Sequence, residues 1–303
     1  MTTELPAVLR GWLAAGQFAD IDDTRIWYRV EGSGPWLVCF HGFPTSSWDW
    51  HRLLPLIRDD FRVLLFDFPG YGLSAKPPRR DYSVLRQLDA AELLLRSLDI
   101  GAFHLLAHDM GDTVACELLH RLEQGQTGLE PLSVTLLNGG IYPDLHRPLP
   151  TQRLLRTRIL GELTARLATW RVFMHQYPRV YAQPGNFDAA HYRAQWALML
   201  HRRGRRTLAK VAVYMRERFR HERRWLDPLH RTGLPLSLIW GREDPIAVLA
   251  MARRLQARQP ATRVEVLDGI GHYPQLEAPD RLAAILRGVL AAPRPDPGMP
   301  GAQ

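Results

Sequence analysis

The stretch LAHDMGD (residues 106–112) follows an apolar run typical of a buried strand and precedes a helical pattern. A sharp strand-to-helix turn needs small residues two positions either side of its central residue, because the backbones approach closely there. Ala107 and Gly111 meet this requirement around Asp109. The helix that begins here directs free N–H groups and its positive dipole end at the Asp109 carboxylate, which favours the ionised, nucleophilic form. An aspartate that merely caps the helix is the competing interpretation.

Strand and helix patterns alternate on both sides of this turn. Strands are predicted at TRIWYRV (24–30), WLVCFHG (36–42), RVLLFDFPG (62–70), AFHLLAH (102–108), LSVTLLNGG (132–140), PLSLIWG (235–241) and TRVEVLDGIG (262–271). Helices are predicted at residues 81–100, 112–125, 245–259 and 280–292, where apolar residues recur on one helical face. This alternation predicts an α/β fold, with a mostly parallel central sheet and helices on both of its faces.

The alternation stops between residues 141 and 232, a segment rich in arginine, histidine and aromatic residues. It carries 19 Arg and Lys against 6 Asp and Glu, whereas the whole chain has a formal charge of +8. We predict a helical cap at 141–232, inserted into a core formed by residues 1–140 and 233–292, and a flexible Pro- and Gly-rich tail at 293–303. No signature of a nucleic-acid-binding fold accompanies the basic run at 201–206, so its charge fits a solvated helix face or weak contact with an anionic membrane surface.

Cys39 and Cys116 are the only cysteines, too few for a disulfide framework and unsuited to a zinc site. They favour a reducing, cytoplasmic compartment. The N-terminus lacks the features of a signal peptide, and no run of residues is long and apolar enough for a membrane span. Residues 5–18 can form an amphipathic helix that packs on the domain or contacts a membrane surface. No metal or organic cofactor is predicted, and nothing indicates the oligomeric state.

Two further groups of residues complete a candidate catalytic site. In the HGFP segment (41–44), the backbone N–H of Phe43 could form an oxyanion hole with the N–H of Met110, although such a segment can also be only a turn. Asp244 follows the next-to-last predicted strand, and His272 follows the last one. This chain order of nucleophile, acid and histidine is the one that accompanies such a strand-to-helix turn.

In this interpretation His272 activates water and Asp244 orients its ring. Glu243 competes for the acid role, but Asp244 stands directly before a proline and fits the turn better.

Along residues 20–292 the sequence resembles the epoxide hydrolase and haloalkane dehalogenase branch of the α/β-hydrolase superfamily. The stretches HDMGD (108–112), LLNGGIYPDLHRP (136–148) and FRHERRW (219–225) are most similar to its mesoderm-specific transcript subgroup. The resemblance implies that Asp109 attacks a carbon atom to form an alkyl-enzyme ester, which water activated by His272 then hydrolyses.

The residues around Asp109 bear on the leaving group. Dehalogenases of this branch resemble one another in having Asn and Trp as halide donors at the positions that Phe43 and Met110 occupy here, so the sequence favours an epoxide. Epoxide opening needs an acid, and tyrosine with its ordinary pKa near 10 is protonated at neutral pH. Tyr214 and Tyr181 resemble the family's two cap tyrosines, and Tyr177 and Tyr192 also lie in the predicted cap.

Trp48 and His108 are candidate residues of the substrate pocket, although Trp48, like Trp50, could instead pack beneath the cap, and His108 beneath the turn. The predicted function is hydrolysis of an epoxide on a small apolar or amphiphilic substrate. The alternatives are a haloalkane or haloacid dehalogenase, and a non-catalytic ligand sensor or scaffold with the same fold.

Overall fold

A single eight-stranded sheet forms the centre of the molecule. The computed structural model describes residues 5–22, 24–157 and 159–290, so the tail predicted at 293–303 lies outside the described residues. The strands are β1 (Gln17–Ile21), β2 (Thr24–Glu31), β3 (Trp36–Phe40), β4 (Arg62–Phe66), β5 (Ala102–His108), β6 (Glu130–Leu137), β7 (Leu236–Gly241) and β8 (Arg263–Leu267). Their order is β1-β2-β4-β3-β5-β6-β7-β8. Only β2 pairs antiparallel with its neighbours, and the other pairs are parallel, which confirms the predicted α/β class.

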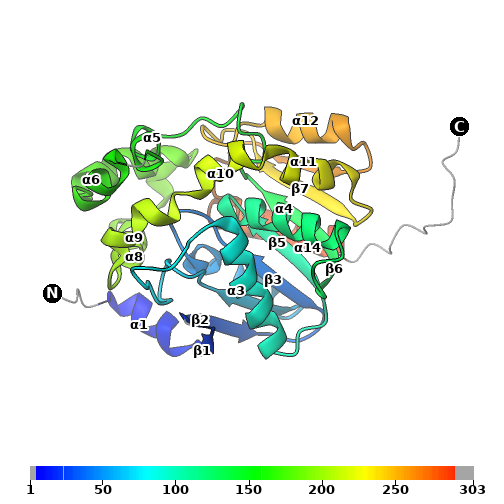
Figure 1. Cartoon of the computed structure of the whole chain (residues 1–303), viewed down its shortest axis with the longest axis horizontal. Coiled ribbons are helices and arrows are strands. Elements are labelled where there is room, and N and C mark those ends of the chain that lie inside the picture. The colour runs from blue at the N-terminus through cyan, green and yellow to red at the C-terminus, as the bar shows by residue number, and fades with distance from the viewer. Residues whose placement is uncertain (1–4, 23, 158, 291–303) are drawn as a thin grey trace, which may run out of the picture.

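Helices surround this sheet on both faces and at one end (Figure 1). Those outside the insert (residues 141–232) are α1 (Ala7–Ala14), α2 (Leu54–Ile57), α3 (Val84–Ser97), α4 (Met110–Glu123), α12 (Ala250–Arg258), α13 (Pro274–Glu277) and α14 (Pro279–Leu290). Those within the insert are α5 (Pro150–Leu155), α6 (Leu160–Arg166), α7 (Trp170–Gln176), α8 (Ala189–Leu200), α9 (Gly204–Val211), α10 (Tyr214–Arg220) and α11 (Glu222–Arg231).

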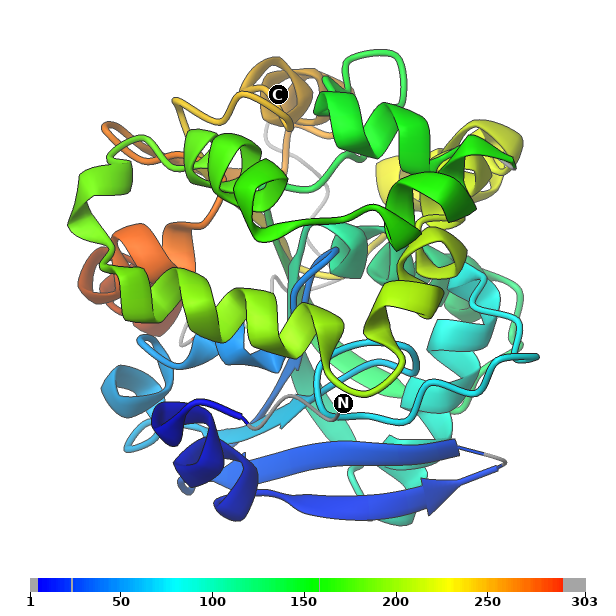
Figure 2. The same cartoon turned by 90° about the vertical axis from the view of Figure 1, so that its left-hand side faces the viewer.

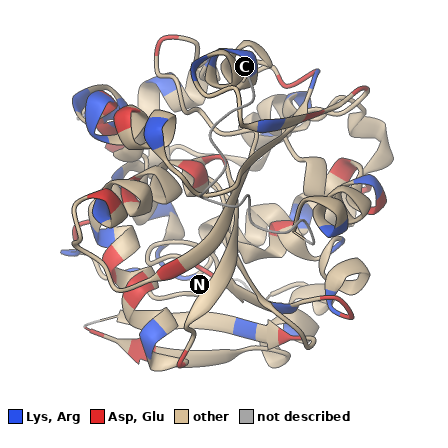
Figure 3. Cartoon of the chain, turned by 90° about the vertical axis from the view of Figure 1, so that its right-hand side faces the viewer, with Lys and Arg blue, Asp and Glu red and all other residues tan. Residues whose placement is uncertain are grey.

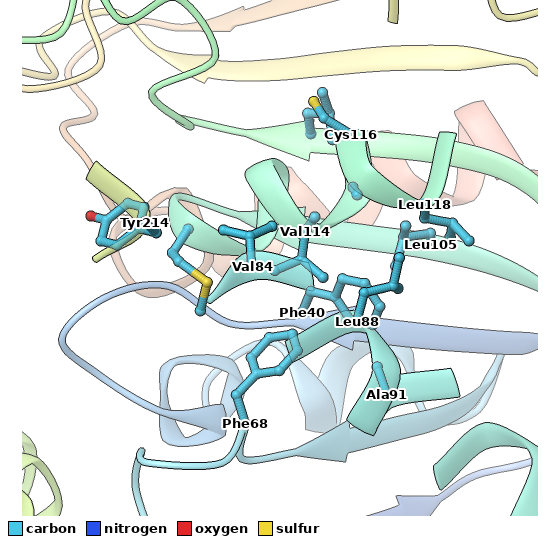
Figure 4. Close-up of a cluster of buried hydrophobic side chains, with 14 of the residues drawn as sticks. Phe40, Phe68, Val84, Leu88, Ala91, Leu105, Val114, Cys116, Leu118 and Tyr214 are labelled. Atoms are coloured by element: carbon cyan, nitrogen blue, oxygen red, sulfur yellow. The ribbon is translucent and has the colours of Figure 1, made fainter. Parts of the chain in front are cut away.

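Alternate side chains of each central strand enter two different hydrophobic clusters. On β3, Val38 and Phe40 belong to a cluster with α3 and α4, whereas Leu37 and Cys39 belong to one with α1, α2 and α14. A strand that is apolar on both faces is the pattern expected of a parallel sheet with helices on either side. Figure 4 shows the first cluster, with Tyr214 of the insert at its edge and the Tyr214 hydroxyl directed away from it.

The insert lies at the end of the sheet where the parallel strands finish (Figures 1 and 2). In its described residues it holds helices and connecting segments and no strand. The last helix of the insert, α11, packs against α4, where Trp225 Nε1 and Arg224 both donate to the Glu117 carboxylate. By contrast, α5 and α6 project away from the sheet (Figure 1).

Three helices are shorter than the sequence predicts, and one of them is α3, which spans Val84–Ser97 against a predicted 81–100. The N-terminal helix was expected over 5–18, but α1 ends at Ala14 and the chain turns at Gly16 into β1. A side chain has no room at this turn, since a Cβ at Gly16 would lie 2.3 Å from the Trp27 ring. Leu9 and Trp12 are buried, so α1 packs on the domain. The helix predicted at 245–259 begins only at Ala250. No helix in the described chain has both the length and the apolarity needed to cross a bilayer.

Candidate active site

The parallel strands deliver the predicted site residues to one edge of the sheet. Phe40, the last residue of β3, pairs with Ala107 of β5, and His108 pairs with Leu137, the last residue of β6. Leu137 in turn pairs with Ile239 of β7. The segments that follow these strands and β8 carry Phe43, Asp109, Asn138, Asp244 and His272.

Asp109 has a strained backbone between β5 and α4. Its φ is 50° and its ψ is −107°, a conformation that L-residues rarely adopt. The neighbouring chain approaches so closely that a Cβ at Gly111 would lie 2.5 Å from the carbonyl oxygen of Phe40, and one at Gly42 would lie 2.8 Å from Asp109 Cβ. The requirement for small residues around this turn therefore has a direct steric cause, as the sequence predicted.

The Asp109 carboxylate does not cap α4, although Asp109 immediately precedes it. Instead Oδ2 accepts a hydrogen bond of 2.8 Å from the backbone N–H of Phe43. This geometry argues against the helix-capping interpretation. The Phe43 N–H, the first predicted oxyanion-hole donor, contacts the Asp109 carboxylate directly. Met110, the second predicted donor, is buried as the first residue of α4, and its role stays a prediction.

His272 and Asp244 form a buried pair beside Asp109. Nδ1 of His272 lies 2.7 Å from Oδ2 of Asp244, while Oδ1 accepts the N–H groups of Ile246 and Ala247 at 2.7 and 3.0 Å. Those two bonds hold residues 244–247 in a turn, which explains why α12 starts late. Burial by itself lowers the pKa of His272, but attraction from Asp244 and then Asp109 outweighs it, and the net pKa is raised above 6.5.

Glu243, the competing acid, is bonded elsewhere. Its Oε2 accepts the N–H of Ile270 at 3.1 Å, so the structure brings Asp244 and not Glu243 to His272.

Asn138 is a site residue that the sequence reasoning missed. Its Nδ2 donates to Asp244 Oδ2 at 2.7 Å, and its Oδ1 accepts the N–H of Gly241 at 2.9 Å. Asn138 also has a positive φ of 45°, which Asn tolerates better than most residues. Its position directly after β6, at the sheet edge that carries the other site residues, was the available signal.

Arg218 is the second residue that sequence reasoning missed. It lies in α10, is 3% exposed, and donates from Nη2 to the carbonyl oxygen of Asp109 at 3.1 Å and from Nε to Thr113 Oγ1 at 2.8 Å. Nη2 also lies 3.8 Å from Asp109 Oδ1. Asp112 is fully buried nearby, and burial together with the charge of Asp109 raises the pKa of Asp112 well above its usual range.

A cavity of about 400 Å³ extends from His272 and Phe43 into the insert. Its wall is mostly apolar and includes Leu155, Phe173, Tyr177, Val180, Trp196, Met199 and Ile246. Asp109, which is 2% exposed, and Tyr214 are not among the described residues that line it, although they lie close to those that do.

Tyr214 lies next to Asp109 in the buried interior. Its ring packs on Phe43 with centroids 5.4 Å apart, and the Arg218 guanidinium lies 4.6 Å from the ring centroid. Burial, and after it repulsion from Asp109, raise the pKa of Tyr214 well above 10, so its hydroxyl is protonated. Within the described residues this hydroxyl has no hydrogen-bond partner.

The structure does not bring Tyr181 to the cavity wall. The Tyr181 hydroxyl is 3.0 Å from Nε2 of His191 and donates to the Tyr177 hydroxyl at 3.2 Å, while its ring stacks on Tyr273. Tyr177, its partner, does line the cavity.

Trp48 and His108, the predicted pocket residues, also lie away from the cavity wall. The Trp48 ring stacks on His51 and meets the edge of Trp12, in the cluster that holds α1 to the sheet. His108 is fully buried, with Nε2 2.8 Å from the carbonyl oxygen of His272. Both therefore pack in the interior and do not line the cavity, which for His108 was the alternative that the sequence allowed.

The class of protein that this fold and arrangement define is a hydrolase of the α/β-hydrolase fold. Residues 35–279 match the alpha/beta hydrolase fold family, and the chain belongs to that family. It is 36% identical to the mesoderm-specific transcript homolog protein of Bos taurus, over 91% of this chain and 86% of that protein. This similarity confirms the subgroup that HDMGD and the other two stretches indicated.

Solved structures with the same fold differ in chemistry. The haloalkane dehalogenase DbeA from Bradyrhizobium elkani superposes with a TM-score of 0.76 at 21% identity, covering 91% of this chain and 98% of that one. A thermophilic esterase from Thermogutta terrifontis gives a TM-score of 0.75 at 20% identity, with the same coverage. These similarities show the fold and do not choose between the two reactions.

Proposed function

We propose that this protein hydrolyses epoxides through a covalent ester on Asp109, with the insert serving as a cap over the site. The observation that carries the proposal is the bond from the Phe43 N–H to the carboxylate of Asp109, at a strained turn beside the His272–Asp244 pair. A carboxylate that merely stabilised the fold would not need a histidine paired with a second carboxylate beside it.

In the first step, Asp109 attacks a carbon of the epoxide ring. Oδ2 is held by Phe43, so Oδ1 is the oxygen that attacks. The C–O bond of the ring breaks, and its oxygen takes a proton from an acid. Arg218 holds the carbonyl oxygen of Asp109 and fixes the backbone of the turn while the carboxylate reacts.

In the second step, His272 removes a proton from water, and the resulting hydroxide attacks Cγ of the ester. The Cγ–Oδ1 bond then breaks, the diol leaves with Oδ1 and takes the proton from His272, and the acid of the first step regains its proton from solvent. The negative charge that develops on Oδ2 is stabilised by the N–H of Phe43 and, as we propose, that of Met110. Forming the ester removes the negative charge of Asp109, which is one of the groups that raise the pKa of His272. The pKa of His272 therefore falls on esterification, so the base becomes neutral more readily at the stage when it is needed.

A proton donor distinguishes the two reactions, because epoxide opening needs an acid at the ring oxygen and halide release does not. The buried Tyr214 hydroxyl is protonated, lies near Asp109 and has no hydrogen-bond partner among the described residues, so it is available to donate to an alkoxide. Tyr177 is a second candidate on the cavity wall, and Tyr181 supports it by donating to its hydroxyl. Phe43 and Met110 offer no side-chain N–H to a leaving halide.

The experiment that tests this function is turnover of matched substrates by the wild-type chain and by Tyr214→Phe. The panel contains terminal epoxides, haloalkanes, haloacids and p-nitrophenyl esters. We expect diol formation from epoxides, and a loss of about 10²–10⁴-fold in Tyr214→Phe, the usual contribution of general-acid catalysis. The substitution removes one hydroxyl with little change in volume, so packing should survive.

A second tyrosine hydroxyl could also donate the proton. This is tested with Tyr177→Phe, Tyr181→Phe and the double variants that combine each with Tyr214→Phe. Full epoxide turnover in Tyr214→Phe/Tyr177→Phe contradicts the tyrosine assignment. Halide release or ester cleavage without epoxide turnover in the wild type contradicts the epoxide proposal itself.

The decrease of the hydrolysis rate at low pH gives a prediction about Asp244. The carboxylate of Asp244 raises the pKa of His272, and only neutral His272 acts as the base, so the hydrolysis rate falls as pH drops through that pKa. In Asp244→Asn this contribution is lost, and we expect the midpoint to move to lower pH while the plateau rate also declines. Single-turnover decay of the ester across pH measures both quantities. Glu243→Gln is the matched control and should leave the midpoint unchanged. An equal shift of the midpoint in Glu243→Gln would contradict the assignment of the effect to Asp244.

A further inference from the structure

The outer surface of the insert carries a group of exposed apolar side chains. Six large hydrophobic residues of α5, α6, the segments that follow them and the start of α7 are exposed; we name them the apolar rim, and they are Leu154, Ile159, Leu160, Leu163, Leu167 and Val172. Ile159 is 85% exposed, Leu167 64% and Leu163 54%. Single exposed apolar residues are ordinary, but a contiguous group marks a surface that binds something.

The apolar rim is continuous with the cavity of the candidate active site. Leu154, Leu167 and Val172 belong both to the rim and to the wall of that cavity, whose other end reaches Phe43 and His272. In Figure 1, α5 and α6 form the part of the molecule farthest from the sheet, and in Figure 2 the insert faces the viewer. A flat surface that met the rim would therefore cover the mouth of the cavity.

The residues around the rim are basic. Exposed side chains on α5–α9 and their connections include Arg153, Arg166, Arg171, Arg202, Arg203 and Arg206. Lys210 is also exposed, but its Nζ donates to the carbonyl oxygen of Pro78, outside the insert. In the described part of the same region, the exposed acidic residues are Glu162 and Asp188. Arg166 pairs loosely with Glu162 at 3.7 Å, and α9 is tied to the end of α6 by the bond from Arg205 Nη1 to the Ala168 carbonyl oxygen. On the opposite side of the molecule, basic and acidic residues are interspersed (Figure 3).

We propose that the apolar rim and the arginines around it dock the insert on a lipid bilayer with anionic headgroups. The leucines insert among the acyl chains, the guanidinium groups lie at the level of the headgroups, and the cavity opens toward the membrane. A second copy of the chain is the other partner for an apolar surface. A symmetric contact through the rim would place the same arginines opposite one another, and this like-charge repulsion disfavours it.

Vesicle co-sedimentation of the full chain tests the proposal without requiring turnover, so its result is independent of the reaction at Asp109. The vesicles are phosphatidylcholine alone and phosphatidylcholine with phosphatidylserine. We expect the wild type to bind the anionic vesicles at least about tenfold more tightly, with the difference shrinking as salt screens the charges.

Two variants separate the apolar and the electrostatic contributions. Ile159→Asp/Leu163→Asp is expected to lower binding to anionic vesicles by at least about tenfold, because neither charge can enter the acyl region. Arg202→Glu/Arg203→Glu/Arg206→Glu is expected to remove the preference for phosphatidylserine. Leu93→Asp is the control, since Leu93 is also exposed but lies outside the insert, and this variant should bind like the wild type.

Failure of the wild type to bind either vesicle overturns the proposal, as does equal binding by the Ile159→Asp/Leu163→Asp variant. A concentration-dependent dimer of the wild type that this variant abolishes, without vesicle binding, assigns the rim to self-association instead. Circular dichroism of each variant confirms the fold, which substitutions of exposed side chains should leave intact.

Discussion

Asp109→Ala is expected to abolish turnover of every substrate that the wild type accepts, by at least about 10⁴-fold. Loss of the nucleophile in a triad-type enzyme has effects of this size, because without it no covalent ester forms and the histidine has no ester to hydrolyse. Asp109 is the carboxylate that the Phe43 N–H holds, and no other described carboxylate shares that arrangement. Initial rates with the best epoxide of the panel measure the effect.

Asp109→Asn serves as the matched control for shape. Asn tolerates a positive φ as Asp does, so the strained turn at φ 50° should persist while the carboxylate charge is lost. Both variants should keep the wild-type circular dichroism spectrum and lack activity. Near-normal turnover in a freshly prepared Asp109→Ala sample would falsify the mechanism, whichever substrate is used.

His272→Gln is expected to separate the two chemical steps. Alkylation of Asp109 does not require a base, whereas hydrolysis of the ester requires water deprotonated by His272. Steady-state turnover should fall by about 10²–10⁴-fold or more, and the ester should accumulate to one per protein chain. Intact mass spectrometry after mixing with substrate measures the adduct, and peptide mapping should locate it on the peptide that contains Asp109.

The neighbouring His108 supplies a control for this experiment. His108 is also fully buried, but burial lowers its pKa to about 3 and its Nε2 is engaged by the carbonyl oxygen of His272. His108→Gln should therefore turn over substrate without trapping an ester. An adduct on any residue other than Asp109, or none in His272→Gln despite slow turnover, is incompatible with the proposed roles.

Much of the fold could be predicted because its determinants are local. The strand AFHLLAH was placed at 102–108, where β5 lies, and the small residues around Asp109 indicated a tight turn that steric contacts now explain. Chain order then linked Asp109, Asp244 and His272. The parallel strands carry all three to one edge of the sheet, so their order along the chain was sufficient.

The parts that could not be predicted depend on packing between distant segments. Arg218 reaches Asp109 across 109 positions of sequence, and nothing in its local pattern distinguishes it from the other arginines of α10. Trp48 sits against α1 and not in the cavity, because α1 folds back on the sheet. Tyr181 and Tyr177 are four residues apart, and only the arrangement of the insert decides which of them faces the cavity.

The origin of the product oxygen tests the central claim, an ester on Asp109, most directly. A single turnover is run in ¹⁸O-labelled water with the wild-type enzyme in excess over an accepted epoxide. The ester mechanism predicts that the new oxygen of the diol comes from the Asp109 carboxylate and is unlabelled in this first turnover. The peptide that contains Asp109 should gain one ¹⁸O atom, because water attacks Cγ. A labelled diol formed in the first turnover, with no label in that peptide, would contradict the account, since it would mean that water attacks the substrate directly.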